Sequence, residues 1–458
     1  MAKKVKKEKV LTIEEKLDKA LVPDVEQPYK IPKNWCWVKL ETLTSITAGG
    51  TPARNNQKFW DGGQIPWVKI SDLSGKNLET TEEKITQLGL DNSSAKIFKK
   101  GTILYTIFAT IGEVAVLNID AATNQAIAGI TCKETQSIDY MYYVLLVLKD
   151  LLVSKSKGVA QVNINQTILK ETPIPLAPLA EQQRIVERIE SFFAKLDEAK
   201  EKAQSIIDSF EDRKTAILHK AFTGELTAEW RLANKISETT WKNLTLNDIA
   251  DYKKGPFGSS ITKTMFVPKG EHTYKVYEQG NAIRKTIDYG SYYINEQKYN
   301  ELKGFAVHAG DIIISCAGTI GEVYKLPREC EAGVINQALM RVRVYSNIKD
   351  RFFIYYFGEI IKGDIRDQAN GTAIKNIPPF KVMKAMKIRL PSLIEQEIII
   401  DLIDGILSKE KRAKVVAEQV IAQIDGIKKS ILSRAFRGEL GTNDPTDEPA
   451  IELLKRIL

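Results

Sequence analysis

The stretch from Glu181 to Phe222, EQQRIVERIESFFAKLDEAKEKAQSIIDSFEDRKTAILHKAF, decides the fold of this 458-residue chain. Its apolar residues recur at alternating spacings of four and three from Ile185 to Ile217, and only Arg213 interrupts them. This heptad pattern predicts a helix that packs along another helix. Such a helix spans roughly 63 Å at about 1.5 Å per residue, which is too long for the inside of one globular domain.

A second stretch repeats the same seam later in the chain, and Glu410 is its one interruption. It opens at a Ser392-x-x-Glu395 capping box, and the two stretches end at Gly224 and Gly438, where a left-handed stop residue belongs. Two such helices need each other, and a pseudo-twofold axis between them predicts an antiparallel pair that holds one globular unit at each end. The residues expected to pair the helices are Ile185, Ile189, Phe192, Leu196, Ile206, Phe210, Ile399, Ile403, Ile406, Val420, Ile424 and Ile427.

The apolar stripe on these helices is wider than a two-stranded seam requires. The additional apolar residues beside the seam are Val186, Phe193, Ile207, Ile400, Leu407 and Ile421. A wide stripe indicates that something else packs on the helix pair. From the residues alone, both a separate protein partner and the globular domains of this chain remain candidates for that role.

The rest of the chain also occurs twice, as short matching islands in divergent surroundings. Thr110-Ile-Gly-Glu-Val114 returns as Thr319-Ile-Gly-Glu-Val323, and Asn124-Gln-Ala126 returns as Asn336-Gln-Ala338. Because the islands occur in both copies, we interpret them as frame or strand-turn elements, although Asn and Gln are also side chains that pair with adenine. A shared frame with different variable segments predicts two related but non-identical contacts.

Around the islands, β-branched runs alternate with Gly, Asn and Asp clusters, which is typical of strands and loops. The predicted fold class is therefore α+β, with two mixed α/β domains related by an internal repeat and joined by two long antiparallel coiled-coil helices. The predicted divisions are an N-terminal arm at 1–33, a first domain at 34–177, a long helix at 178–224, a linker and second domain at 225–390, a second long helix at 391–438 and a tail at 439–458.

Composition indicates an ordinary globular protein of the cytoplasm. The chain is 27% charged with a formal net charge of +8, which favours an anionic partner without proving one. It has no run of eighteen apolar residues and no apolar stretch after its basic start. The cysteines, Cys36, Cys132, Cys316 and Cys330, form no Cys-x-x-Cys pair, so we expect neither disulfides nor a zinc site.

Several motifs resemble the DNA-specificity subunit of type I restriction-modification systems, and the resemblance covers nearly the whole chain. They include Gly49-Gly-Thr-Pro52, Pro66-Trp-Val-Lys-Ile-Ser71, Gly255-Pro-Phe-Gly-Ser259 and Pro178-Leu-Ala-Glu-Gln-Gln183. One departure is Pro391-Ser-Leu-Ile-Glu-Gln396, which carries an extra residue at the start of the second helix.

The resemblance implies two target-recognition domains, each reading one half of a bipartite site on double-stranded DNA, with the helices setting the unread spacer. It also implies that two adenine methyltransferase subunits dock on the helices and that two motor-nuclease restriction subunits complete the complex. S-adenosylmethionine, ATP and Mg would then belong to the partners, and this chain would hold no cofactor, no metal and no membrane contact.

Polar and basic residues beside Gly-rich loops are the candidate DNA contacts, because such loops can present side chains to base edges and phosphates. In the first domain they are Thr51, Arg54, Asn55, Lys69 and Ser71. In the second domain they are Lys253, Lys254, Ser259, Ser260, Lys275 and Arg284.

Two other classes of function compete with this interpretation. An adenine methyltransferase needs a polar residue directly before Pro-Pro-aromatic, but in Asn376-Ile-Pro-Pro-Phe380 an isoleucine intervenes, and the chain has no phosphate-loop spacing. We therefore expect no catalytic residues and no intrinsic catalysis. The second alternative is a coiled-coil scaffold whose globular ends bind proteins, and the sequence does not exclude it.

Overall fold

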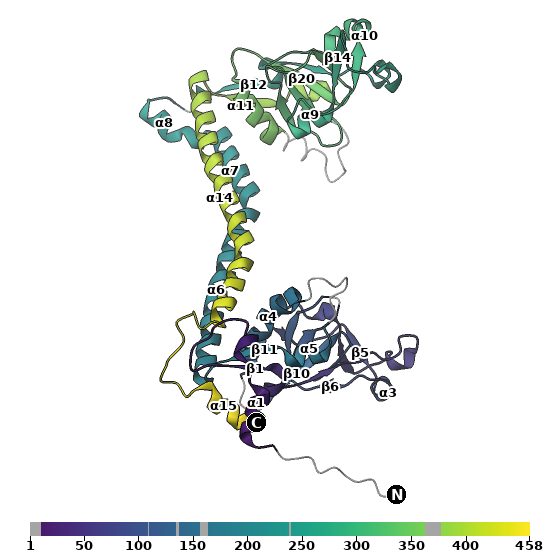
Figure 1. Cartoon of the computed structure of the whole chain (residues 1–458). Coiled ribbons are helices and arrows are strands. Elements are labelled where there is room, and N and C mark those ends of the chain that lie inside the picture. Colours follow the sequence, from purple (N-terminus) through teal and green to yellow (C-terminus); the bar gives the residue numbers. More distant parts are fainter. Residues whose placement is uncertain (1–10, 109, 134–136, 156–163, 238–239, 362–376) are drawn as a thin grey trace. The chain divides into compact units, whose positions relative to one another are not determined.

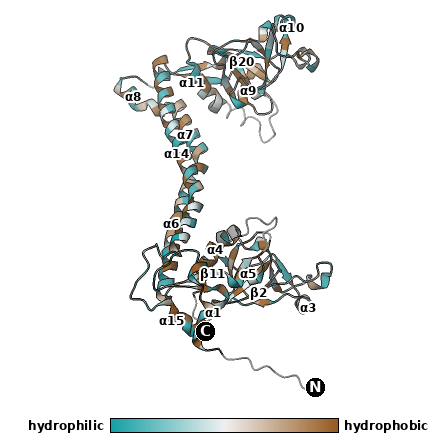
Figure 2. Cartoon of the chain, in the orientation of Figure 1, coloured by the Kyte–Doolittle hydropathy of each residue, from teal (hydrophilic) through white to brown (hydrophobic). Residues whose placement is uncertain are grey.

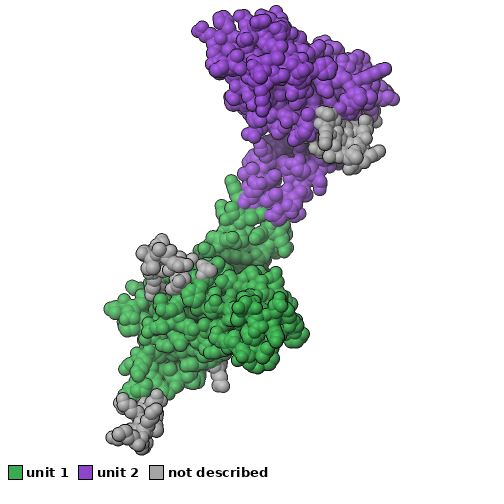
Figure 3. All heavy atoms as spheres, turned by 90° about the vertical axis from the view of Figure 1, so that its right-hand side faces the viewer, with its two compact units in different colours: residues 1–202, 419–458 green, residues 203–418 purple. Residues whose placement is uncertain are grey.

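The computed structural model describes residues 11–108, 110–133, 137–155, 164–237, 240–361 and 377–458 (Figure 1). The first ten residues of the predicted N-terminal arm therefore lie outside the described residues. The chain forms two compact units, which are residues 1–202 with 419–458 and residues 203–418 (Figure 3). The sequence suggested divisions at the helix ends, whereas the two units divide both long helices part-way, because each helix end packs on a globular domain.

The first domain contains two sheets. The first sheet has the strand order β2-β10-β7-β8-β4, and the second has the order β5-β3-β9-β6, with β3 and β9 parallel. The strands are β2 Thr44–Ala48, β3 Ile65–Val68, β4 Asn77–Leu78, β5 Glu83–Ile85, β6 Ile97–Phe98, β7 Ile103–Thr106, β8 Val114–Leu117, β9 Ala121–Thr123 and β10 Ile127–Cys132. The helices are α2 Leu40–Leu43, α3 Gln87–Asp91, α4 Ile138–Lys155 and α5 Gln166–Glu171.

The second domain repeats this topology. Its sheets have the orders β13-β20-β17-β18 and β15-β14-β19-β16, and β14 and β19 are parallel as β3 and β9 are. The edge strand β4, which pairs parallel with β8 in the first domain, has no counterpart among these strands. The strands are β13 Ala250–Lys254, β14 Thr273–Tyr277, β15 Tyr293–Asn295, β16 Ala306–Val307, β17 Ile312–Ser315, β18 Val323–Lys325, β19 Gly333–Ile335 and β20 Leu339–Val344. The helices are α8 Ala228–Ala233, α9 Gln279–Arg284, α10 Glu296–Glu301, α11 Asp350–Tyr355 and α13 Phe380–Lys384. The predicted internal repeat is confirmed at the level of strand order.

A two-stranded ribbon joins each domain to the start of a long helix. In the first unit β1 Cys36–Lys39 pairs antiparallel with β11 Pro173–Leu176, and in the second β12 Lys242–Thr245 pairs with β21 Lys387–Leu390. The tail helix α15 Ala450–Ile457 contacts α1 Ile13–Ala20, and the backbone N–H of Ala450 donates to the carbonyl of Asn34 at 2.9 Å. The first and last described helices, α1 and α15, therefore pack together in the first unit.

The long helices pack together in each unit, which confirms the predicted helix pair. Helix α14 Leu393–Ala435 is continuous over 43 residues, but the first helix is not. It is divided into α6 Leu179–Asp208 and α7 Phe210–Thr223, because Ser209 leaves the helical conformation with ψ near 3°. The hydroxyl of Ser209 donates to the carbonyl of Ser205 at this break. The prediction of one uninterrupted first helix was therefore wrong, because the helix is broken at Ser209.

Contacts between the helices show an antiparallel arrangement in the second unit, where Phe210 lies under Lys414 and the later residue Arg213 meets the earlier residue Glu410. In the first unit Lys428 of α14 pairs with Asp197 of α6 at 2.5 Å. In the second unit Arg213 of α7 pairs with Glu410 of α14 at 2.7 Å. Arg213 and Glu410 are the two residues that interrupt the heptad seam, so each interruption is the partner of the other.

The helix-pairing residues differ in burial. Ile185, Ile189, Ile399, Ile403 and Ile424 are buried, and Phe192, Leu196, Phe210 and Ile406 are half-buried. Ile206, Val420 and Ile427 are 38%, 38% and 42% exposed. Ile185 and Ile189 belong to the core of the first domain and Ile399 and Ile403 to that of the second, whereas Ile424 is buried outside both cores.

A buried glutamate in the first turns of each long helix anchors that helix to its domain. Glu395 accepts hydrogen bonds from the Trp241 indole at 2.9 Å and from the Thr227 hydroxyl at 2.8 Å, and it pairs with Arg231 at 2.6 Å. The Ser392 hydroxyl does accept from the N–H of Glu395 at 3.3 Å. The carboxylate is engaged elsewhere, so only half of the predicted capping box forms.

The corresponding residue of the first unit is Glu181, which is fully buried. Its carboxylate accepts from the Trp35 indole at 2.7 Å, from the Thr442 hydroxyl at 3.2 Å and from the Asn443 amide at 2.8 Å. In both units the anchor joins three parts: the start of a domain, the start of one long helix and the segment that follows the other.

Candidate nucleic-acid interface

The loop after β2 is held against the turn that contains Asn124. The N–H of Gly49 donates to the carbonyl of Ile127 at 3.1 Å, and that of Gly50 donates to the carbonyl of Thr123 at 2.8 Å. A Cβ on Gly49 would lie 2.0 Å from the Thr123 hydroxyl oxygen, so no larger residue fits without movement. This packing brings Thr51, a predicted contact, beside Gln125, to which its hydroxyl donates.

Arg54 and Lys69, two further predicted contacts, converge on one carboxylate. Arg54 pairs with Glu83 at 2.5 Å and lies 3.8 Å above the Trp60 ring, while Lys69 pairs with Glu83 at 3.2 Å and with Glu82 at 2.5 Å. Burial alone raises the pKa of Glu83, but hydrogen bonds from Arg54 and Lys69 outweigh it and lower that pKa. A phosphate that binds Arg54 or Lys69 would compete with these carboxylates for the two cations. Asn55 and Ser71, the other predicted contacts of this domain, are exposed.

The second domain places a comparable surface after β13. Lys253 and Lys254 are exposed on the strand, and Ser259 with half-buried Ser260 forms a short turn beyond it. Phe257 lies between them and is 87% exposed, although the sequence analysis did not select it. The sequence feature that could have identified Phe257 as a candidate contact is its position in the Gly255-Pro-Phe-Gly258 motif.

Lys275 and Arg284 differ from the expectation that the candidates lie on loops. Lys275 lies within β14, only 4% of its side chain is exposed, and its Nζ is 3.9 Å from Glu331. As placed, Lys275 cannot reach DNA without a rearrangement of the strand. Arg284 ends α9 and is exposed, with its guanidinium 4.9 Å from the Tyr289 ring centre.

The shared Thr-Ile-Gly-Glu-Val islands are strand turns, as predicted. Gly112 has φ of +84° in the turn between β7 and β8, and Gly321 has φ of +79° in the turn between β17 and β18. In both turns a hydroxyl at the end of the first strand closes the loop: Thr106 bonds to the carbonyl of Thr110, and Ser315 bonds to that of Thr319 at 2.6 Å. The Thr106 and Ser315 side chains therefore stabilise turns that both domains share.

A basic groove in the first domain was missed by the sequence analysis. It has a volume of about 500 Å³ and lies between β6 and the end of β10. Its lining includes Lys96, Lys99, Lys100 and Lys133, all exposed, and Lys99 also pairs with Asp120 at 2.7 Å. The signal was present as the lysines in Lys96-Ile-Phe-Lys-Lys100. An exposed group of cations is the electrostatic footprint expected of a phosphate-binding surface.

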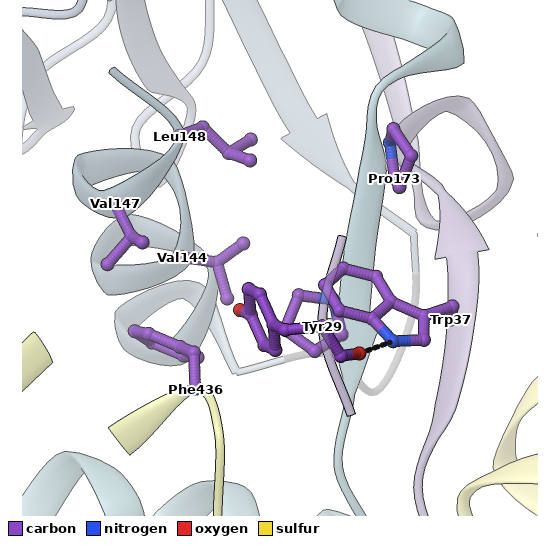
Figure 4. Close-up of a pocket in the computed structure, with 8 residues that line it drawn as sticks. Tyr29, Trp37, Val144, Val147, Leu148, Pro173 and Phe436 are labelled. Atoms are coloured by element: carbon purple, nitrogen blue, oxygen red, sulfur yellow. Dashed lines mark hydrogen bonds between the residues drawn. The ribbon is translucent and has the colours of Figure 1, made fainter. Parts of the chain in front are cut away.

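A second cavity is structural. It holds about 40 Å³ and is lined by apolar and aromatic side chains from the N-terminal arm, β1, α4, β11 and the end of α14 (Figure 4). The Trp37 indole donates to the carbonyl of Tyr29 at 3.2 Å, and the two rings meet edge to face at 4.8 Å. Burial raises the pKa of Tyr29 to about 12, so this phenol stays neutral. The space is too small for a nucleotide or another cofactor.

Within the described ranges, no group of three His, Cys, Asp or Glu residues could hold a metal ion. No helix among the described residues is long and apolar enough to cross a bilayer. Asn376, the start of the rejected methyltransferase-like motif, lies outside the described residues.

Two domains of one topology, built on one frame and carrying different exposed loops, match a known family. The model for the type I restriction modification DNA specificity domain matches residues 32–206 and again residues 238–416. The chain belongs to this family. It is a specificity subunit with two copies of the domain, and it is a non-catalytic subunit of a type I restriction enzyme.

Relatives cover this specificity subunit to different extents. It is 33% identical over 184 residues to the MjaIX specificity subunit of Methanocaldococcus jannaschii, an alignment that spans 39% of this chain and 42% of that protein. It is 22% identical over 441 residues to the EcoBI specificity subunit of Escherichia coli, which spans 92% of this chain and 89% of that protein.

Solved structures show the same fold. The HsdS subunit from Thermoanaerobacter tengcongensis superposes with a TM-score of 0.62 at 20% identity, over 91% of the specificity subunit and 100% of that chain. A chain from a study of the assembly and conformational transition of the type I R-M system superposes with a TM-score of 0.58 at 19% identity. That alignment covers 90% of this chain and 100% of the other.

Proposed function

We propose that this specificity subunit binds double-stranded DNA, with each recognition domain reading one half of a bipartite, asymmetric site. The observation that carries the proposal is the difference between two equivalent loops on one shared frame. Gly49 and Gly255 both pack against an Asn-Gln-Ala turn, yet the residues that follow are Thr51 in one domain and Phe257 in the other. Equal frames with unequal loops suit two different base sequences.

The helix pair is proposed to set the unread spacer and to dock two adenine methyltransferase subunits. Hydrophobic and hydrophilic residues alternate along α14 (Figure 2). Three of its hydrophobic residues support the docking because they are exposed: Leu402 by 36%, Val415 by 43% and Val416 by 56%. Exposed apolar surface of this kind is typical of a protein interface. Two motor-nuclease subunits complete the proposed cytoplasmic complex, in which S-adenosylmethionine, ATP and Mg are held by the partners.

The test is to co-express the specificity subunit with its methyltransferase subunit and to map methylated adenines across a genome. The expected result is one bipartite motif with an unread spacer of fixed length. Exchanging residues 34–177 for another recognition domain should then replace one half of the motif and leave the other unchanged. A stable complex that methylates no bipartite motif would contradict the proposal.

A second measurement separates DNA reading from protein scaffolding. Phosphate contacts release counterions, so the logarithm of the DNA affinity should fall linearly with the logarithm of the salt concentration, by roughly 0.9 for each phosphate neutralised. Affinity that does not change with salt would favour the scaffold alternative.

A further inference from the structure

The Asn-Gln-Ala turns of the two domains have the same hydrogen bonds. The Asn124 side chain accepts from the N–H of Ala126 at 2.9 Å, and the Asn336 side chain accepts from that of Ala338 at 3.0 Å. The carbonyl of Ala126 accepts from Ile107 and that of Ala338 accepts from Cys316, each at 2.8 Å. The asparagine and the alanine of each turn therefore have a structural role, because both make hydrogen bonds that hold the turn in place.

The glutamine between them is not explained by the frame. Gln125 and Gln337 are both exposed. The side-chain oxygen of Gln125 accepts from the Thr51 hydroxyl, and among the described residues its NH₂ group has no hydrogen-bond partner. The Gln337 side chain likewise has no hydrogen-bond partner in the described part of the chain. Packing cannot account for an exposed residue that is identical in two copies whose neighbouring residues differ.

We propose that Gln125 and Gln337 donate hydrogen bonds to the sugar–phosphate backbone of the DNA, one in each half-site. This inference rests on the proposed function. An asymmetric site presents different bases to the two domains, but it presents the same phosphate groups to both. A neutral amide NH₂ supplies two donors and phosphate oxygens are acceptors, so the chemistry is complementary.

The surroundings of the two glutamines favour DNA over a protein partner. Gln125 contacts Thr51, whose equivalent in the second domain is Phe257, and the turn that carries Gln337 packs on Gly255, beside exposed Lys254. A surface whose composition changes between the copies suits two different half-sites. It does not suit two copies of one methyltransferase subunit, which require matching surfaces.

The experiment uses the full complex with its methyltransferase subunits and measures DNA affinity and the methylated motif. Gln125→Ala and Gln337→Ala should each weaken binding about 3- to 10-fold, the usual loss for one hydrogen bond, and the double variant by roughly the product. The motif should remain unchanged. Gln125→Lys should bind DNA more tightly than Gln125→Ala, because lysine supplies a cation to the phosphate. Gln125→Glu should bind more weakly than Gln125→Ala, because the carboxylate repels the phosphate.

The matched controls are Gln87→Ala and Gln297→Ala, which alter exposed glutamines on α3 and α10 of the same domains and should leave affinity unchanged. Unaltered affinity in the double variant would overturn the inference. A motif relaxed at one base pair would assign the glutamines to base reading instead, and failure to assemble with the methyltransferase would assign them to the partner. A wild-type complex that binds no DNA would refute the proposed function itself.

Discussion

Buried side chains hold each long helix to its domain, and Arg231–Glu395 is the ion pair among these contacts. The side chains are 3% and 1% exposed, and Arg231 also donates to the carbonyl of Gly224 at 2.6 Å. Removing one partner of a buried pair leaves an uncompensated charge, which is far more costly than losing an exposed pair.

Arg231→Met should therefore lower the free energy of unfolding by about 3–5 kcal/mol, measured by chemical denaturation of the full chain. The control is Lys202→Met, because the Lys202–Glu198 pair on α6 is 74% and 62% exposed. The control should change stability by less than about 1 kcal/mol. Equal effects of the two substitutions would refute the anchoring role of Arg231.

The close approach of Gly49 to the Asn124 turn gives a second prediction. In Gly49→Ala the new Cβ would lie 2.0 Å from the Thr123 hydroxyl oxygen and 2.4 Å from its carbonyl oxygen. The backbone must move, so we expect a loss of about 1–3 kcal/mol in unfolding free energy and weaker DNA binding. Gly75→Ala is the control, because nothing lies within 4 Å of its Cβ. A neutral Gly49→Ala would contradict the close-packed frame.

Among the elements, the break between α6 and α7 coincides with the polar contact of the helix pair. Arg213 bonds to Glu410, to the hydroxyl of Ser209 and, at 3.0 Å, to the carbonyl of Ile206. One side chain therefore caps the end of α6 and fixes its alignment with α14. A single polar pair within an apolar seam can specify register at a cost in stability.

Arg213→Glu should destabilise the helix pair, because it places two carboxylates where an ion pair stood. The double reversal Arg213→Glu with Glu410→Arg should recover on the order of 1 kcal/mol, since the pair is about one-third exposed and partly screened. A double-mutant cycle of thermal unfolding measures the coupling. Additive effects of the two reversals would mean that the pair does not hold the register.

For the whole molecule, the proposed spacer function makes a prediction about length. One heptad inserted into both long helices adds roughly 10 Å at about 1.5 Å per residue. At about 3.4 Å per base pair, the spacer should lengthen by about three base pairs with both half-sites unchanged. Methylation mapping of the complex reads both properties. An unaltered spacer would refute the idea that the helices act as a ruler.

Repeats and periodicity in the sequence were sufficient to predict two helices, their pairing and two domains of one fold. The heptad spacing of Ile185 or Ile399 is a local property that no distant residue needs to complete. The islands likewise showed that the frame occurs twice. The same local reasoning treated Arg213 and Glu410 as separate interruptions, because nothing in a periodic pattern says which residues of two helices face each other.

Only the tertiary structure decided which polar residues are committed to the frame and which face solvent. Lys275 resembles a loop lysine in the sequence but is buried in β14, and Glu395 resembles a capping residue but binds Arg231 and Trp241. Asn124 and Gln125 are neighbours in the sequence, but the structure shows that the Asn124 side chain is hydrogen-bonded within its turn whereas Gln125 is exposed. Burial and hydrogen-bond partners depend on strands and helices that are far apart in the chain, and that information exists only once the chain has folded.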